Sequence, residues 1–201
     1  MERVILARHG ESVFSARQLV NGEVAVAGPL TEHGREEARE LGRAIASDGI
    51  DACVTSEFER TRETADLALD GRDVPRLVVP ELNDPRYGRF EGGALEEYRS
   101  WASAATSRDS VPGGGESRWR IVDRYVRGYV RGFRHVLARA EETVLVVVHS
   151  LPIAYVLAAH DGTAPAPRVP LVAHAHPYRF ARAELDAAVT VLEDWCAAPT
   201  W

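Results

Sequence analysis

The sequence predicts an α/β fold: a three-layer α/β/α sandwich with a mostly parallel central sheet, helices on both faces and a lid inserted over one edge. Two continuous apolar runs, residues 4–7 and 144–148, each stop abruptly at a polar segment that contains a histidine. Such runs are typical of strands buried on both faces of a parallel sheet. Helix-like patterns separate the runs along the chain, which is the alternation expected of α/β units.

The composition bounds the size of the fold and the classes of partner. With 201 residues, 45% of them hydrophobic, the chain is long enough for one well-buried domain, residues 1–201, and short for two. A net charge of −6 and a pI near 5.7 argue against a general binder of nucleic acid or anionic membranes. All 24 Lys and Arg residues are arginine, so cationic contacts with a substrate have to come from guanidinium groups, which suit planar anions.

Cysteine usage and the first residues bear on the compartment. Cys53 and Cys196 lie far apart in apolar surroundings, which predicts buried free thiols in a reducing compartment. The chain enters its first strand almost at once, leaving no room for a signal peptide, and no apolar run reaches membrane-spanning length. We therefore expect a soluble, cytoplasmic protein. The sequence leaves the oligomeric state open, with a homodimer as one alternative.

The first quarter of the chain follows the α/β pattern. Residues 12–29 have no sustained period and are predicted to form a loop over the end of the first strand. Thr31 is predicted to cap a helix that stops at Asp48-Gly49, and residues 52–55 are predicted as the second strand.

The next helix is predicted to begin at a capping box formed by Ser56 and Glu59. This start places Arg60 in the first turn, where free backbone amides and the positive end of the helix dipole favour an anion. The alternative is an ordinary solvated arginine that pairs with Glu57 or Glu63.

The middle of the chain is predicted to carry a third strand and a lid. Residues 76–79 are predicted as a short strand. Residues 81–115 are charged and rich in Pro and Gly, with one helix over 95–105, and a stretch this irregular is typical of a functional loop. Residues 122–137 then carry an apolar stripe at helical spacing, with arginines on a solvated face.

The apolar run 144–148 ends at His149, and a helix is predicted to follow from Ser150. The same arrangement occurs at the first strand, which ends at Arg8 and His9. Because sequential α/β units bring the carboxyl ends of parallel strands to one edge of the sheet, both histidines are predicted to border one crevice.

The tail is predicted as two strands, residues 177–183 and 189–195, joined by a turn. His174 and His176 form an H-x-H pair, but no third ligand is apparent nearby. We therefore interpret both as surface or edge-strand histidines and predict no metal site.

Six short motifs carry the functional hypothesis. They are Arg8-His9-Gly10-Glu11-Ser12, Leu30-Thr31-Glu32-His33-Gly34, Ser56 with Arg60-Thr61-Arg62-Glu63-Thr64-Ala65, residues 82–92, Gly114-Gly115-Glu116-Ser117 and Val147-Val148-His149-Ser150. In this order they resemble the histidine phosphatase superfamily, in its phosphoglycerate-mutase-like branch, over most of the chain.

The resemblance implies phosphoryl transfer to His9 as the nucleophile, without a metal ion or organic cofactor, and a small phosphorylated substrate. Phosphoryl groups in transfer spread charge over their peripheral oxygens, so fixed cationic donors must surround them. Arg8 and Arg60 would supply these donors, together with a protonated His149. His9 must be neutral to attack, and the neighbouring guanidiniums should lower its pKa.

The resemblance also implies a proton donor for the leaving group and further phosphate contacts. Asp84 stands where the family more often has glutamate, and we assign it the donor role, with Glu91 as the alternative. Ser15 and Asn21 are expected to contact the phosphate, although the family frequently has asparagine where Ser15 stands.

Two departures favour a phosphatase over a mutase: Asp84, and Gly22 followed by Glu23 where the mutase branch has tryptophan. A mutase that moves phosphate within a sugar acid and a non-catalytic phosphate-binding relic remain as alternatives. The substrate stays undefined. Arg86 and Arg89 either meet a second anionic group or are simply exposed.

Four aromatic residues leave a similar choice. Phe14, Tyr87, Phe90 and Trp101 either form an apolar pocket wall or pack the lid.

Overall fold

A five-stranded sheet forms the centre of the computed structural model, which describes residues 2–121, 123–124, 126–128, 141–166 and 168–200. The strands are β1 (Arg3–Arg8), β2 (Ala52–Thr55), β3 (Arg76–Val78), β4 (Thr143–Val148) and β5 (Tyr178–Ala181). Their order is β3-β2-β4-β1-β5, and only the pairing of β5 with β1 is antiparallel. The mostly parallel sheet predicted from the sequence is confirmed.

The register of the two central strands brings the two predicted histidines together. Arg8 at the end of β1 pairs with Val148 at the end of β4, and the backbone N–H of His9 donates to the Val148 carbonyl at 2.9 Å. Since both strands run the same way, His9 and His149 leave the sheet at the same edge.

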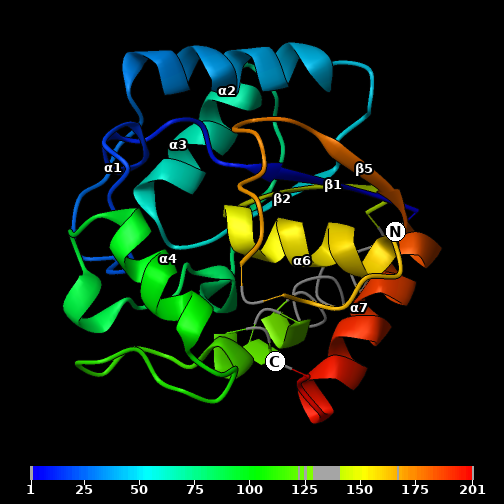
Figure 1. Cartoon of the computed structure of the whole chain (residues 1–201). Coiled ribbons are helices and arrows are strands. Elements are labelled where there is room, and N and C mark those ends of the chain that lie inside the picture. The colour runs from blue at the N-terminus through cyan, green and yellow to red at the C-terminus, as the bar shows by residue number, and fades with distance from the viewer. Residues whose placement is uncertain (1, 122, 125, 129–140, 167, 201) are drawn as a thin grey trace.

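Helices cover both faces of the sheet (Figure 1). Helices α2 (Glu32–Ala44) and α3 (Glu59–Ala68) pack on one face, and α6 (Ser150–His160) and α7 (Arg182–Ala197) pack on the other. The other elements include the short helices α1 (Val13–Ala16), η1 (Pro80–Leu82) and η2 (Gly88–Phe90) and the longer α4 (Leu95–Ala104). The three-layer prediction is therefore confirmed.

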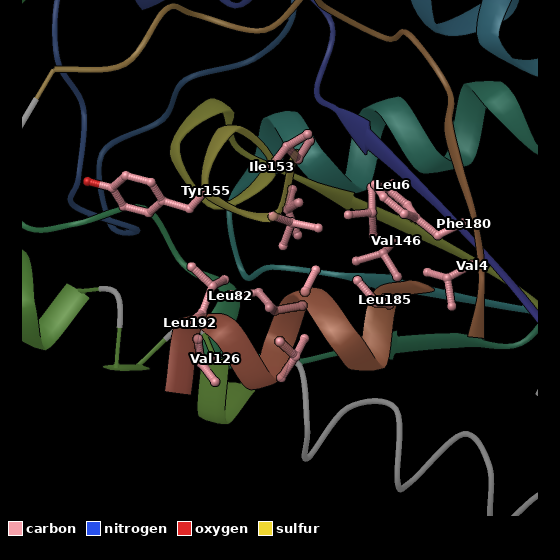
Figure 2. Packing of buried hydrophobic residues seen from close by; sticks show 14 of the residues in the cluster. Val4, Leu6, Leu82, Val126, Val146, Ile153, Tyr155, Phe180, Leu185 and Leu192 are labelled. Atoms are coloured by element: carbon pink, nitrogen blue, oxygen red, sulfur yellow. The ribbon is translucent and has the colours of Figure 1, made fainter. Parts of the chain in front are cut away.

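The larger core lies between the sheet and the α6/α7 layer. Figure 2 shows side chains of the strands, such as Leu6 and Val146, gathered with Ile153 of α6 and with Leu185 and Leu192 of α7. Burying one such aliphatic side chain contributes roughly 1.5–3 kcal/mol. This packing of α6 and α7 against the sheet holds the strand ends that the candidate site residues follow.

The predicted second strand of the tail is wrong, because residues 189–195 belong to α7. The run Val189-Thr190-Val191 has the β-branched residues that favour a strand. However, the buried residues Leu185, Leu192 and Trp195 of α7 recur at helical spacing and face the core. Burial of that stripe against the sheet outweighs the local strand propensity.

Two smaller corrections concern helix starts. Helix α3 has Phe58 as its N-cap, so the predicted capping box at Ser56 and Glu59 is wrong. Arg60 nevertheless lies in the first turn of α3. Residues 12–29 contain the short helix α1, which Ser12 caps, where only loop was expected.

Part of the predicted helix over 122–137 lies outside the described residues, because 122, 125 and 129–140 are not described. Residues 118–121, 123–124 and 126–128 are helical, and Val126 is buried. Arg124 is not simply solvated as expected, since it is half-buried and donates to the Asn83 carbonyl at 3.1 Å.

Cys53 and Cys196 are both buried and free, as expected. None of the helices that the structure describes combines the length and the hydrophobicity that spanning a bilayer requires.

Candidate active site

A pocket opens at the edge of the sheet where β1 and β4 end. Its inner end is lined by Arg8, His9, Ser12, Ser15, Asn21, Arg60 and Asp84. Six of these seven residues were assigned from the sequence, Ser12 being the exception. His149 is fully buried beside them, and its ring centroid lies 5.5 Å from that of His9.

The hydrogen bonding of His9 fixes its tautomer. Its Nδ1 lies 2.7 Å from the Gly10 carbonyl oxygen, which can only accept, so Nδ1 carries the proton and Nε2 keeps its lone pair. Burial, followed by the charges of Arg60 and Arg8, holds the pKa of His9 well below its usual range. The neutral form is therefore favoured, with burial as a larger cause than the like-charge repulsion expected from the sequence.

Two glycines let the end of β1 lie against the start of α2. A Cβ at Gly10 would lie 2.3 Å from the Gly34 carbonyl oxygen, and one at Gly34 would lie 2.0 Å from the Glu11 carbonyl oxygen. Thr31 caps α2 by accepting from the Gly34 N–H at 3.0 Å and also donates to Glu11 Oε1 at 2.8 Å. This close approach explains why both motifs contain glycine, and it fixes the backbone that follows His9.

Arg60 reaches the pocket from the first turn of α3. Its Nη1 donates to Asn21 Oδ1 at 2.7 Å, and its Nη2 donates to the Asn21 carbonyl at 3.1 Å and to Asp84 Oδ2 at 3.0 Å. The guanidinium also stacks over the Phe58 ring, 4.0 Å from its centroid. Asn21 thus orients Arg60, in addition to the phosphate contact expected of it.

His149 is held on both ring nitrogens. Its Nδ1 lies 3.3 Å from Arg60 Nη2 and 3.4 Å from Asp84 Oδ2, and its Nε2 lies 3.0 Å from Ser56 Oγ. Burial, then Arg60 and Arg8, hold the pKa of His149 well below its usual range. Burial and the two arginines thus favour the neutral form of His149, whereas the role expected from the sequence uses its protonated form.

Burial favours the protonated form of the Asp84 carboxyl. Burial raises the pKa of its carboxyl above the usual range, although Arg60 and Arg8 pull it the other way. Its side chain is 16% exposed and lines the pocket. The preceding Asn83 accepts the Glu57 N–H at 2.9 Å on its side-chain oxygen, which pins this part of the segment 81–115.

Glu91, the alternative proton donor, holds the backbone. Its Oε2 accepts from the Gly22 N–H at 2.9 Å, and its Oε1 accepts from the Tyr87 N–H at 2.6 Å. Gly22 has no room for a side chain, since a Cβ there would lie 1.9 Å from the Pro85 carbonyl oxygen. Glu91 is outside the pocket lining and ties two loops of the site together.

The hydroxyl of Ser15 is already engaged in the cap of α1. The Ser12 N–H donates to Ser15 Oγ at 2.7 Å, and the Ser15 N–H donates to Ser12 Oγ at 3.2 Å. A phosphate contact by Ser15 has to be made by this same hydroxyl.

A chain segment far away in the sequence completes the inner end of the pocket. Arg8 Nη1 donates to the Val172 carbonyl at 2.8 Å, and the Ala175 N–H donates to the Arg8 carbonyl at 2.9 Å. The Val172 N–H donates to Ser150 Oγ at 3.0 Å. Burial lowers the pKa of Arg8 to about 10, which still leaves it a cation at neutral pH.

The same segment brings His174 to the site, which corrects the prediction of a surface or edge-strand residue. His174 lines the pocket with its ring centroid 5.8 Å from that of His9, and its Nδ1 lies 3.8 Å from Glu37 Oε1. Burial is the main cause that lowers its pKa to about 3. His176, its partner in the H-x-H pair, is exposed. The pair was visible in the sequence, but no local signal distinguishes its two members.

The outer end of the pocket is largely apolar. It is lined by Leu19, Leu95, Tyr98, Ala102, Leu151, Val169, Pro170 and Leu171, with Arg99, Arg118 and Arg168 among them. The arginines singled out from the sequence lie elsewhere: Arg86 pairs with Glu23 at 3.1 Å, and Arg89 lies over the Phe90 ring.

Tyr87 has both roles, because it lines the pocket and packs on Tyr98 with ring centroids 4.7 Å apart, whereas the other three aromatic residues have one role each. Phe14 and Tyr87 line the pocket. Phe90 and Trp101 instead pack on Tyr98, with ring centroids 6.0 Å from it in each case, inside a small cluster that holds α4 in place.

Comparisons with known proteins agree with this geometry. The family model described as "Histidine phosphatase superfamily (branch 1)" matches residues 4–195. An adenosylcobalamin/alpha-ribazole phosphatase of Salmonella typhimurium is 35% identical over 133 residues, which is 62% of this chain and only 65% of that relative's length. A 2,3-bisphosphoglycerate-dependent phosphoglycerate mutase of a Methylobacterium species is 34% identical over 81% of this chain and 82% of its own.

Solved structures have the same fold. The alpha-ribazole phosphatase of Shigella flexneri superimposes with a TM-score of 0.74 at 25% identity, over 88% of this chain and 89% of that one.

Proposed function

The chain belongs to branch 1 of the histidine phosphatase superfamily, and on that premise we propose that it hydrolyses a phosphomonoester through a phosphohistidine on His9. The observation that carries the proposal is the state of His9, whose Nδ1–H is bound to the Gly10 carbonyl while Nε2 keeps its lone pair. A neutral imidazole beside Arg8 and Arg60 is a nucleophile next to an anion-binding site.

In the first step, His9 Nε2 forms a bond to phosphorus as the bond from phosphorus to the ester oxygen breaks. The electron pair of that bond goes to the leaving oxygen, which takes a proton from the Asp84 carboxyl. Arg8 and Arg60 stabilise the charge on the peripheral oxygens throughout. The raised pKa of Asp84 supports its donor role, because it keeps the proton available.

In the second step, a water molecule attacks phosphorus and gives a proton to the Asp84 carboxylate. The bond between phosphorus and His9 Nε2 breaks, its electron pair returns to the ring, and inorganic phosphate leaves. His9 is then neutral and Asp84 is protonated, as both are in the free enzyme.

We assign His149, Ser15 and Asn21 to the phosphoryl group as further contacts. A bound dianion favours the protonated form of His149, because it offsets the repulsion from Arg8 and Arg60. Asn21 acts in addition through Arg60, whose guanidinium it holds by two hydrogen bonds.

The reaction is proposed to need no metal ion, because guanidinium groups supply the positive charge that the phosphoryl oxygens require. Activity is therefore expected to survive an excess of chelator. The substrate is proposed to be a small phosphorylated molecule in the cytoplasm, and residues 81–115 are proposed to act as a lid within a single domain.

The second candidate is phosphoryl transfer within a phosphoglycerate, as the name of the Methylobacterium relative indicates for that protein. The apolar outer end of the pocket favours hydrolysis of an ester with an apolar body. A phosphoglycerate offers no apolar surface to bury there. Return of labelled phosphate in an isomeric product, in place of free phosphate, would support the mutase.

The test is to trap the intermediate. The protein is mixed with an ester carrying labelled phosphate and quenched in base, and we expect acid-labile label on His9. His9→Ala is expected to lose both the label and nearly all turnover, while His176→Ala, which alters an exposed histidine, keeps both. Turnover without label on His9 contradicts the proposal. Tight phosphate or vanadate binding without turnover of any ester supports the alternative of a non-catalytic phosphate-binding protein.

A further inference from the structure

The outer end of the pocket is built from two facing walls. Helix α4 contributes Leu95, Tyr98 and Ala102, which recur at helical spacing and so share one face of the helix. Residues 169–171 and Leu151 supply the other lining. A leaving group held here can bury apolar surface over most of its body.

One cation interrupts this wall without a matching carboxylate. Arg99 lies on the same face of α4, is half-buried and lines the pocket. Its Nη2 donates to the Val169 carbonyl at 3.3 Å, and it makes no ion pair with any residue that the structure describes. A guanidinium has five N–H donors, so this bond leaves others for a ligand.

The neighbouring cation differs in this respect. Arg168 donates to both carboxylate oxygens of Glu96, at 3.2 and 3.0 Å, so its charge is matched within the protein. Glu96 and Arg168 also join α4 to the opposite wall, as the bond from Arg99 to Val169 does. The two walls are thus held at a set distance, with the charge of Arg99 unmatched between them.

We propose that this outer end is a leaving-group subsite for an apolar body bearing one anionic group, and that Arg99 is the specificity-determining residue that binds this group. A purely apolar leaving group would leave the half-buried guanidinium without a counter-charge, which is costly. A small, wholly polar one would leave the apolar walls unfilled. The inference rests on the proposed function, since it concerns the leaving group of that reaction.

The experiment compares matched aryl phosphates with and without a ring carboxylate: phenyl against carboxyphenyl phosphate, and naphthyl against carboxynaphthyl phosphate. For each enzyme, the ratio of kcat/KM within a pair is measured. Because every variant is compared on the same two esters, differences in leaving-group acidity cancel. We expect the wild type to favour the carboxylated ester and Arg99→Gln to lower the ratio about ten- to a hundredfold, the range for a hydrogen bond to a charged group.

Arg89→Gln is the matched control, because Arg89 belongs to the same segment but lies outside the pocket lining. It is expected to keep the wild-type ratio, and Arg99→Lys is expected to fall between wild type and Arg99→Gln. An unchanged ratio in Arg99→Gln, with activity on the uncharged esters intact, overturns the inference and leaves the proposed function standing. A wild type that hydrolyses none of these or other esters overturns the proposed function, and this inference with it.

Discussion

Replacing Asp84 with asparagine tests the proposed chemistry most directly. The variant removes the proton but keeps a side-chain oxygen that can accept the bond from Arg60, now 3.0 Å long. Both side chains have the same shape, so the pocket is expected to keep its geometry. Any loss that depends on the leaving group then reports on proton donation.

The magnitude follows from what a positioned acid contributes. Proton donation accelerates such steps roughly 10²- to 10⁴-fold, or about 3–5.5 kcal/mol of barrier. The full loss is expected for alkyl esters, whose alkoxides leave poorly without a proton. Nitrophenyl phosphate should lose less than about tenfold, because nitrophenolate leaves as the anion.

The assay is kcat/KM for a series of esters plotted against the acidity of the leaving group. We expect a shallow dependence for the wild type and a steep one for Asp84→Asn. Glu91→Gln is the control: its carboxylate accepts from the Gly22 and Tyr87 amides, so its slope should match that of the wild type. Equal losses across the series for Asp84→Asn, or a steep slope for Glu91→Gln, would refute the assignment.

The remaining predictions concern pH and the tail. The pKa of His9 is lowered and that of Asp84 is raised. As the pH increases, kcat/KM should therefore rise through the pKa of His9, which lies below the usual histidine value of about 6.5. It should then fall through the pKa of Asp84, which lies above the usual aspartate value of about 3.9. Asp84→Asn should abolish the alkaline fall, and persistence of that fall would contradict the donor role. Leu192→Ala, in the core at 2% exposure, should cost about 2–5 kcal/mol of unfolding free energy in urea, whereas Val191→Ala, at 40%, should cost far less. Similar costs for both would contradict the burial of Leu192 in the core.

Local sequence patterns were sufficient to predict the central strands and the placement of several site residues. The two apolar runs predicted parallel strands that end at His9 and His149, because a strand buried on both faces has to be apolar throughout. The motif around Arg60 placed it correctly in the first turn of α3, although the helix begins at Glu59 with Phe58 as its cap.

Other features depend on contacts between segments that are distant in the sequence. His174 lines the pocket because the segment after Val172 is bound to Arg8, 164 positions away, and no local spacing records that contact. In the same way Glu91 is committed to two backbone amides, which separates it from Asp84 although both are carboxylates of one segment.

Helix α7 shows why local sequence pattern alone does not determine secondary structure. Val189 and its neighbours have strand propensity, but Leu192 and Trp195 gain burial against the sheet only when the segment is helical. Propensity is a local quantity worth tenths of a kcal/mol per residue, whereas burial depends on the partner surface, which only the assembled fold supplies. The unmatched charge of Arg99 likewise exists only once α4 and residues 168–171 face each other.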